Sequence, residues 1–203
     1  FGGRRNDTNN QSGDMTPPDN NNMTLPDNSN MQTPSDDTTD KQPVLLITGG
    51  KITVNADGDG LDSNGNLRVE GGDITVNGPS NGGNGALDIG TENGGAGVIA
   101  GGTLIALGAS SMAENFGSTS TQCAFLVTMN SFGAGETITI TDSQGTVLYT
   151  GVTVKSANSV VFSSADLVVG ETYTVTIGSS SATVTQSSTV VGNSNGFGGF
   201  GRH

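Results

Sequence analysis

Four candidate oxygen ligands lie close together in the stretch NADGDGLDSNG, residues 55–65, between two short apolar runs. They are Asp57, Asp59, Asp62 and Asn64. Carboxylate and amide oxygens gathered at one tight turn can serve a calcium ion, which takes about six to eight oxygen ligands. Asp, Asn and Gly also make ordinary turns that bind nothing. The residues alone therefore leave a plain turn and a calcium site open.

A catalytic acid pair is a third interpretation of the same carboxylates. A glycosidase needs one carboxylic acid whose pKa is raised by an apolar pocket, and this glycine-rich turn offers none. A polysaccharide lyase that uses calcium also needs a cationic base, Arg or Lys, close to its substrate. Lys51 and Arg68 are the only basic residues between positions 44 and 117. We therefore expect no catalysis, and we predict Lys51 and Arg68 as contacts to an anionic ligand.

The charge balance narrows the class of partner. The 203 residues include 19 acidic and 7 basic side chains, which gives a net charge of −12. Such a chain is a poor match for nucleic acid, whose phosphates are neutralised by Lys and Arg. It has no apolar run of about 18 residues, so we expect no membrane insertion. An acidic surface does favour divalent cations.

The composition and a repeat predict the elements that position these side chains. Glycine is abundant, at 33 residues, and aromatic residues make up only 4%, which favours many short strands joined by tight turns. Glycine pairs begin at positions 49, 71 and 101, and apolar residues alternate with polar ones around each pair. Successive coils of about 20–30 residues, each with short strands and a glycine bend, are typical of a parallel β-helix. The apolar phase consists of Leu45, Ile47, Ile52, Val54, Leu67, Val69, Ile74, Val76, Ile99, Leu104 and Ala106.

The same repeat adds one residue to the candidate calcium site. The triplets GLD at 60–62 and ALD at 86–88 occupy equivalent places in successive coils. Asp88 is therefore expected near Asp62 and could complete the set of oxygen ligands.

The chain divides into four predicted parts. Residues 1–43 form a low-complexity linker or insertion rich in Asn, Asp and Pro, with an octapeptide repeat, and residues 44–117 form the β-helix coils. Residues 118–190 hold six short strands, which we expect to pair in an antiparallel manner as a C-terminal cap or a small sandwich. Residues 191–203 are a Gly/Phe-rich tail. With only three coils visible, the first has an open end that could support self-association.

The order of segments carries a resemblance to a known family. The series GGKITVNADGDGLDSNG, GGDITVNGPSNGGNGALDIG and GGTLIALGASSMAENF is followed by ETITITDSQG and by SVVFSSADLVVGETYTVTIGSSSATVT. This series resembles the C-terminal part of a family of carbohydrate-binding domains of bacterial cell-surface and cellulosome-associated proteins. The resemblance covers about residues 44–186 and implies a right-handed parallel β-helix that carries calcium and binds polygalacturonate and cellulose.

Together these observations predict an all-β, non-catalytic carbohydrate-binding module that is secreted or displayed on a bacterial cell surface. Calcium held by the Asp turns would bridge this acidic protein to an acidic plant-cell-wall polysaccharide such as polygalacturonate. The alternative is a structural subunit of a surface fibre, built by head-to-tail stacking of β-solenoid ends.

Overall fold

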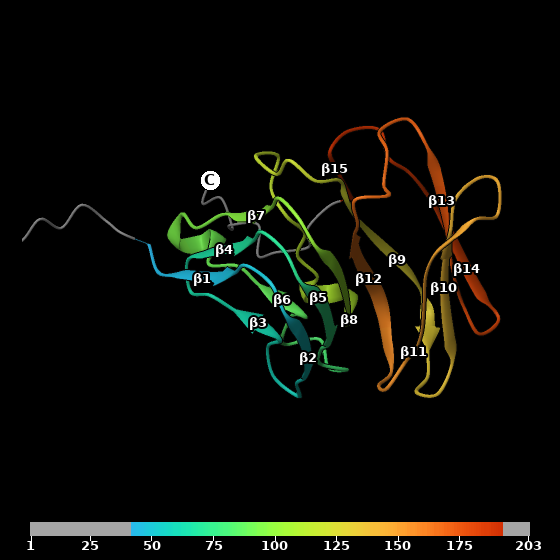
Figure 1. Cartoon of the computed structure of the whole chain (residues 1–203). Helices are drawn as coiled ribbons and strands as arrows, with labels where there is room; N and C mark the ends of the chain where they lie inside the picture. The colour runs from blue at the N-terminus through green and yellow to red at the C-terminus, as the bar shows by residue number, and fades with distance from the viewer. Residues whose placement is uncertain (1–41, 193–203) are drawn as a thin grey trace, which may run out of the picture. The chain divides into compact units, whose positions relative to one another are not determined.

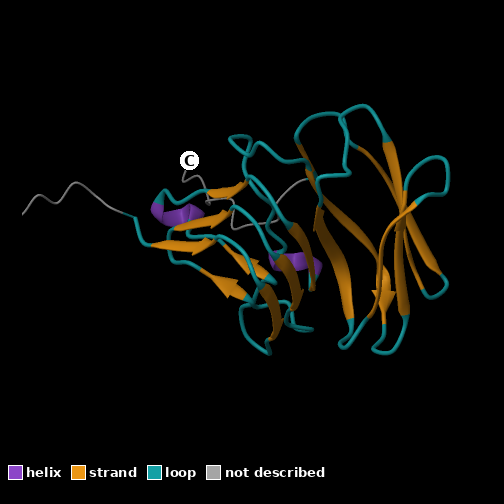
Figure 2. Ribbon diagram, in the orientation of Figure 1, coloured by secondary structure: helices purple, strands orange, loops and turns teal. Residues whose placement is uncertain are grey.

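The computed structural model describes residues 42–192, which form strands and two short 3-10 turns, Thr91–Asn93 (η1) and Ser110–Met112 (η2). The chain is therefore all-β over this range, as predicted (Figure 2). Most of the predicted linker and tail, residues 1–41 and 193–203, lies outside the described residues.

The part of the chain around the glycine pairs forms three parallel sets of strands. One set contains β1 (Val44–Ile47), β4 (Asn66–Val69) and β7 (Gly97–Ile99), and a second contains β2 (Lys51–Asn55), β5 (Asp73–Asn77) and β8 (Thr103–Gly108). A third set pairs β3 (Leu61–Asp62) with β6 (Leu87–Asp88). Ile52 pairs with Ile74 and Ile74 with Leu104, so the registers repeat the sequence spacings of 22 and 30 residues. We call each successive group of strands a coil: β1, β2 and β3 form the first coil, β4, β5 and β6 the second, and β7 and β8 the third. The strands of one coil thus pair with the equivalent strands of the next (Figure 1).

The predicted apolar phase points inward. Leu67, Val76 and Leu104 have no exposed surface, and the other apolar positions of the second and third coils join them in one core. The predicted glycine corners are also confirmed. The second glycine of each pair has a positive φ, and a Cβ on Gly102 would lie 2.6 Å from the carbonyl oxygen of Gly72.

The remaining strands extend one of these sheets and add another. The strands β9 (Ala124–Phe132), β12 (Ala157–Ser163) and β15 (Val190–Val191) join the second set in a six-stranded sheet, the shared sheet, with the order β15-β9-β12-β8-β5-β2. The strands β10 (Thr137–Thr141), β11 (Val147–Val152), β13 (Thr172–Ile177) and β14 (Ser180–Thr185) form the antiparallel outer sheet, with the order β11-β10-β13-β14. All six predicted C-terminal strands are present as β9 to β14.

A second core lies between the shared sheet and the outer sheet, and we call this region the sandwich (Figure 1). Phe125, Phe162 and Tyr173 are its largest fully buried side chains, and each is no more than 1% exposed. The strand β8 serves both cores, because Leu104 and Ala106 face the coils while Ile105 and Leu107 face the sandwich.

The two ends of the coils differ. At the third coil, β12 pairs with β8, the backbone of residues 117–122 bonds to β7, and Glu114 accepts a hydrogen bond from the Ile89 N–H. At the first coil, β1, β2 and β3 are edge strands of their sheets within residues 42–192, and Val44 and Leu46 are 58% and 51% exposed. Head-to-tail stacking needs two open ends, so the closed third coil disfavours that form of assembly.

Candidate functional site

The aspartates at equivalent places in successive coils do meet. Asp62 on β3 and Asp88 on β6 are partners in a parallel register. Strands in a sheet lie about 4.7–4.9 Å apart, and register partners point to the same face. The two carboxylates are therefore neighbours on one side of the coils, as the repeat predicts.

Further carboxylates surround this pair. Burial raises the pKa of Asp88, and the negative charges of Asp59, Asp62 and Glu92 raise it further. We call the set Asp59, Asp62, Asp88, Glu92 and Glu114 the acidic side.

Glu114 belongs to this set from the loop after the third coil. Its side chain is almost fully buried, and this burial raises its pKa, with smaller contributions from the charges of Asp88 and Glu92. Its carboxylate accepts hydrogen bonds from the Ile89 N–H at 2.7 Å and from the Thr91 hydroxyl at 3.3 Å, and both bonds lower the pKa. Glu92 and Glu114 were not predicted, because no glycine pair or repeat marks their positions.

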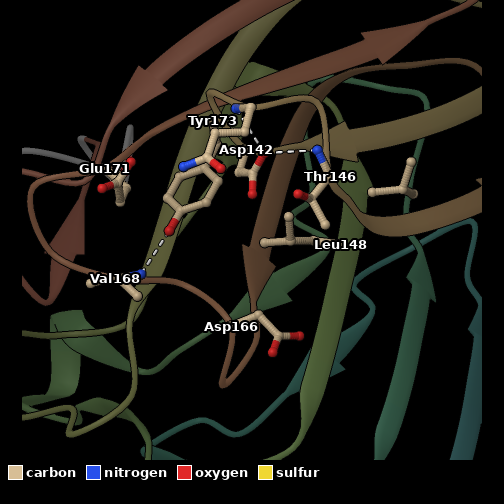
Figure 3. A pocket seen from close by; sticks show the side chains of 9 residues that line it. Asp142, Thr146, Leu148, Asp166, Val168, Glu171 and Tyr173 are labelled. Atoms are coloured by element: carbon tan, nitrogen blue, oxygen red, sulfur yellow. Dashed lines mark hydrogen bonds between the residues drawn. The ribbon is translucent and has the colours of Figure 1, made fainter.

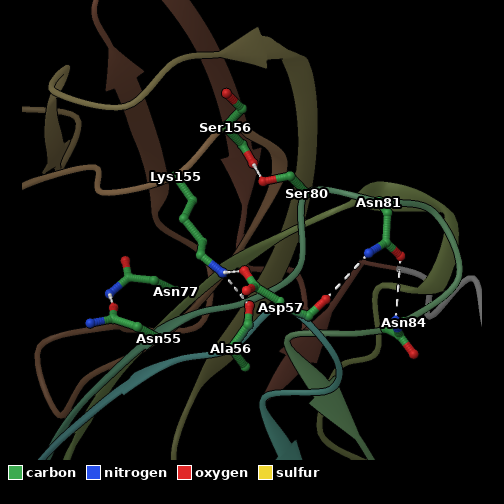
Figure 4. A network of polar contacts seen from close by, with 9 residues as sticks. All are labelled: Asn55, Ala56, Asp57, Asn77, Ser80, Asn81, Asn84, Lys155 and Ser156. Carbon is green, nitrogen blue, oxygen red and sulfur yellow. Dashed lines mark hydrogen bonds and ion pairs between the residues drawn. The ribbon is translucent and has the colours of Figure 1, made fainter.

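Asp57 lies apart from the acidic side, although it belongs to the same turn in sequence. Its carboxylate is 2.5 Å from the ammonium group of Lys155, which also donates a hydrogen bond to the carbonyl oxygen of Ala56 (Figure 4). The hydrogen bond and charge of Lys155 lower the pKa of Asp57. The contact joins the first coil to the segment between β11 and β12 in the sandwich. In this geometry Asp57 is paired with Lys155 and does not lie with the other predicted calcium ligands.

The other predicted ligands take part in turns. Asp59 accepts a hydrogen bond from the Gly85 N–H at 2.8 Å, and Asp62 accepts one from the Asn64 N–H at 3.2 Å. Asn64 has a φ of 44°, which suits a tight turn. Over residues 42–192, no three His, Cys, Asp or Glu side chains converge closely enough to hold one metal ion. In the structure these residues therefore act in turns. Calcium binding stays a prediction, and the carboxylates would have to move closer together to share one ion.

The two predicted cationic contacts lie on different sheets and carry exposed ion pairs. Lys51 on β2 is 3.6 Å from Asp73, and Arg68 on β4 is 2.6 Å from Glu70. Exposed pairs of this kind contribute little to stability, so both cations can exchange partners readily. They do not form one site with each other.

Two hollows lie outside the predicted site. The larger, about 380 Å³, is at one end of the outer sheet, where Asp142, Asp166 and Glu171 line it (Figure 3). The N–H groups of Gln144 and Thr146 donate to Asp142 at 2.9 and 2.8 Å and keep its pKa low, so this carboxylate also caps a turn. The smaller hollow, about 280 Å³, is a neutral groove whose polar lining is Ser80, Ser110, Ser111, Ser131, Ser156 and Asn158.

The outward face of the outer sheet is uncharged. Its four strands contain no Asp, Glu, Lys or Arg, in contrast to the acidic chain as a whole. Threonines lie side by side across the strands in two rows, and their side chains are exposed or half-buried. The rows are Thr150, Thr139 and Thr176, and Thr141, Thr174 and Thr183. Hydroxyl groups both donate and accept hydrogen bonds, which suits contact with sugar hydroxyls.

Comparison of the chain with protein-family models, with curated protein sequences and with solved structures finds no match. The resemblance to carbohydrate-binding domains therefore stays a prediction from the residues quoted above. Within residues 42–192, no helix is long and apolar enough to cross a membrane.

Proposed function

We propose that this chain is a non-catalytic carbohydrate-binding module of a secreted or surface-displayed bacterial protein. Its three coils belong to a right-handed parallel β-helix, and the sandwich caps them. It binds an acidic plant-cell-wall polysaccharide such as polygalacturonate, with calcium as the bridge between the protein and the glycan.

The observation that carries this proposal is the register of Asp62 on Asp88, with Asp59 and Glu92 close enough to raise the pKa of Asp88. Carboxylates that repel one another are stabilised by a hard cation, and calcium binds carboxylate oxygens. A calcium ion at Asp59, Asp62 and Asp88, with Asn64 at the same turn, would leave coordination positions for uronate carboxylates. The net charge of −12 makes such a bridge necessary for an anionic ligand.

Lys51 and Arg68 fit this proposal as secondary contacts. Each lies on an exposed strand position and is held only by a surface ion pair. The uncharged threonine face of the outer sheet adds a surface where the neutral parts of a polysaccharide can form hydrogen bonds.

The test compares polygalacturonate binding in calcium and in chelator for the wild type, for the double variant Asp62→Asn/Asp88→Asn and for Asp57→Asn. We expect binding in calcium only, and a loss of about tenfold or more in the double variant, which corresponds to about 1.4 kcal/mol. Asp57→Asn is the matched control, because its partner is Lys155 rather than the acidic side. Equal binding in calcium and in chelator would refute the calcium bridge, and an absence of glycan binding in both would refute the function itself.

Self-association is the second candidate, and the first coil favours it, because no strand within residues 42–192 covers its outer edge. Its inward side chains Leu45, Ile52 and Val54 are only partly buried. Because the third coil is closed, two open ends would meet face to face and form a dimer rather than a fibre. Light scattering distinguishes the candidates, since a monomer at micromolar concentration excludes this contact as the main function.

A further inference from the structure

We propose that the Asn81–Gly82 peptide is a site of spontaneous deamidation in the folded protein, selected from five Asn–Gly pairs by its hydrogen bonding. This inference does not depend on calcium or on carbohydrate binding. The five pairs in residues 42–192 begin at Asn64, Asn77, Asn81, Asn84 and Asn93. A sixth, Asn195–Gly196, lies outside the described residues.

The reaction at such a pair needs a free backbone nitrogen. The nitrogen of the glycine attacks the side-chain carbonyl carbon of the asparagine, and a carbon–nitrogen bond forms as the amide nitrogen leaves as ammonia with the glycine proton. Water then opens the five-membered imide at either carbonyl and leaves an aspartate or an isoaspartate. Water is the only co-reactant, and glycine favours the attack because it has no side chain to obstruct it.

Four of the five glycine nitrogens already donate a hydrogen bond. Gly78 donates to the Leu107 carbonyl at 2.8 Å, Gly85 to Asp59 at 2.8 Å and Gly94 to the Thr91 carbonyl at 3.1 Å. Gly65 is buried and donates to the Ser63 hydroxyl at 3.4 Å. Gly82 is exposed, and its nitrogen has no hydrogen-bond partner within the described part of the chain.

The side-chain carbonyl group of Asn81, which the glycine nitrogen attacks, is also activated by a hydrogen bond. The side-chain oxygen of Asn81 accepts a hydrogen bond from the Gly83 N–H at 3.1 Å. A donor aimed at this oxygen stabilises the negative charge that develops there during attack. The side-chain nitrogen, which leaves, donates to the carbonyl oxygen of Asp57 at 3.2 Å (Figure 4).

The product changes a contact between two coils. Loss of the Asn81 amide removes the donor to Asp57 in the first coil, and a new negative charge takes its place. The loop of residues 78–85 also borders the neutral groove through Ser80 and Gly82. An isoaspartate lengthens the backbone of this loop, so the shape of the groove changes with the age of the protein.

The experiment is peptide mapping by mass spectrometry after incubation of the full chain in warm, mildly alkaline buffer. In the folded protein we expect the Asn81 peptide to be converted at least about fivefold faster than the other four, because each of those must first break a hydrogen bond worth about 1 kcal/mol. In denaturant the five rates should become similar, since the peptide sequences are all Asn–Gly. The tail pair at Asn195 is followed separately.

Two variants sharpen the test. Gly82→Ala should suppress the conversion and leave the fold intact, because the position has no positive φ and the new Cβ meets only the exposed side chain of Ser111, whose hydroxyl at 2.8 Å can rotate away. Gly83→Ala is the matched control, with only the Asn81 side chain within 4 Å of its Cβ. Equal or faster conversion at any of the other four pairs in the folded protein, or no conversion at Asn81, would overturn the proposal.

Discussion

The coils and the sandwich share the strand β8 but are packed on different principles. Where one coil lies on the next, glycine backbone meets backbone: a Cβ on Gly60 would lie 2.2 Å from the Ala86 carbonyl oxygen, and one on Gly95 would lie 2.2 Å from that of Gly65. The sandwich is filled by rings instead. The ring centroids of Phe125 and Phe162 are 5.6 Å apart.

The two regions also distribute charge differently. The acidic side belongs to the coils, while the strands of the outer sheet carry no charged residue. The coils therefore combine close backbone packing with charge repulsion, whereas the sandwich combines apolar burial with outer-sheet strands that carry no charge. We expect the sandwich to be sensitive to loss of volume and the coils to be sensitive to gain of volume.

The largest effect should follow loss of volume in the sandwich. Phe162 is fully buried and contacts the rings of Phe125 and Tyr149. Phe162→Ala should lower the free energy of unfolding by about 3–5 kcal/mol, since the lost burial is compounded by a cavity. Urea unfolding followed by circular dichroism measures this. Val147→Ala, at a position 56% exposed, is the control, and equal losses in the two variants would contradict the comparison.

A gain of one methyl group in the coils should have the next largest effect. Gly90 has a φ of −64°, which alanine can adopt, but its Cβ would lie 2.3 Å from the Asn64 carbonyl carbon and the Gly65 nitrogen. Gly90→Ala should therefore lower the free energy of unfolding by about 1–3 kcal/mol through overpacking alone.

Gly58→Ala is the matched control for this variant, because nothing lies within 4 Å of its Cβ. It should leave stability unchanged or raise it by up to about 1 kcal/mol. If Gly90→Ala were as stable as Gly58→Ala, the close packing of one coil on the next would be wrong.

The coils were predictable from sequence because their determinants are local and repeated. The glycine pairs and the period-two alternation fix which side chains point inward, and the Asp62–Asp88 neighbourhood follows from the repeat. The coverage of the shared sheet could also have been inferred. Ile105 and Leu107 are apolar although they point away from the core of the coils. The register partners of these two positions in the first two coils are polar: Thr53, Asn55, Thr75 and Asn77.

Contacts between distant segments could not be found in this way. Asp57 and Lys155 are 98 residues apart, and no pattern in either segment indicates their pairing. Glu114 reaches the acidic side from a loop that does not repeat the earlier coils. Whether Asp59, Asp62 and Asp88 hold a cation depends on side-chain positions, which a repeat does not determine.

The smallest effect concerns the charge of the acidic side. Burial and then the charges of Asp59, Asp62 and Glu92 raise the pKa of Asp88 above its ordinary value of 3.8. The folded protein thus binds this proton more tightly than the unfolded chain does. The ionised carboxylate therefore destabilises the fold above the raised pKa, and this destabilisation decreases as the pH falls through the raised pKa and is gone below the ordinary value.

Without calcium, Asp88→Asn should consequently be more stable than the wild type at neutral pH, by less than about 1 kcal/mol because solvent screens the site. The advantage should shrink as the pH falls through the raised pKa and vanish at about pH 3, where the wild-type carboxyl is largely protonated in both states. Urea unfolding of both proteins across this pH range measures the difference. Asp57→Asn is the control of opposite sign, because Lys155 lowers the pKa of Asp57 and favours its ionised form. A less stable Asp88→Asn variant at neutral pH would mean that attraction, rather than repulsion, dominates the acidic side, and the contrast with the uncharged strands of the outer sheet would lose its electrostatic basis.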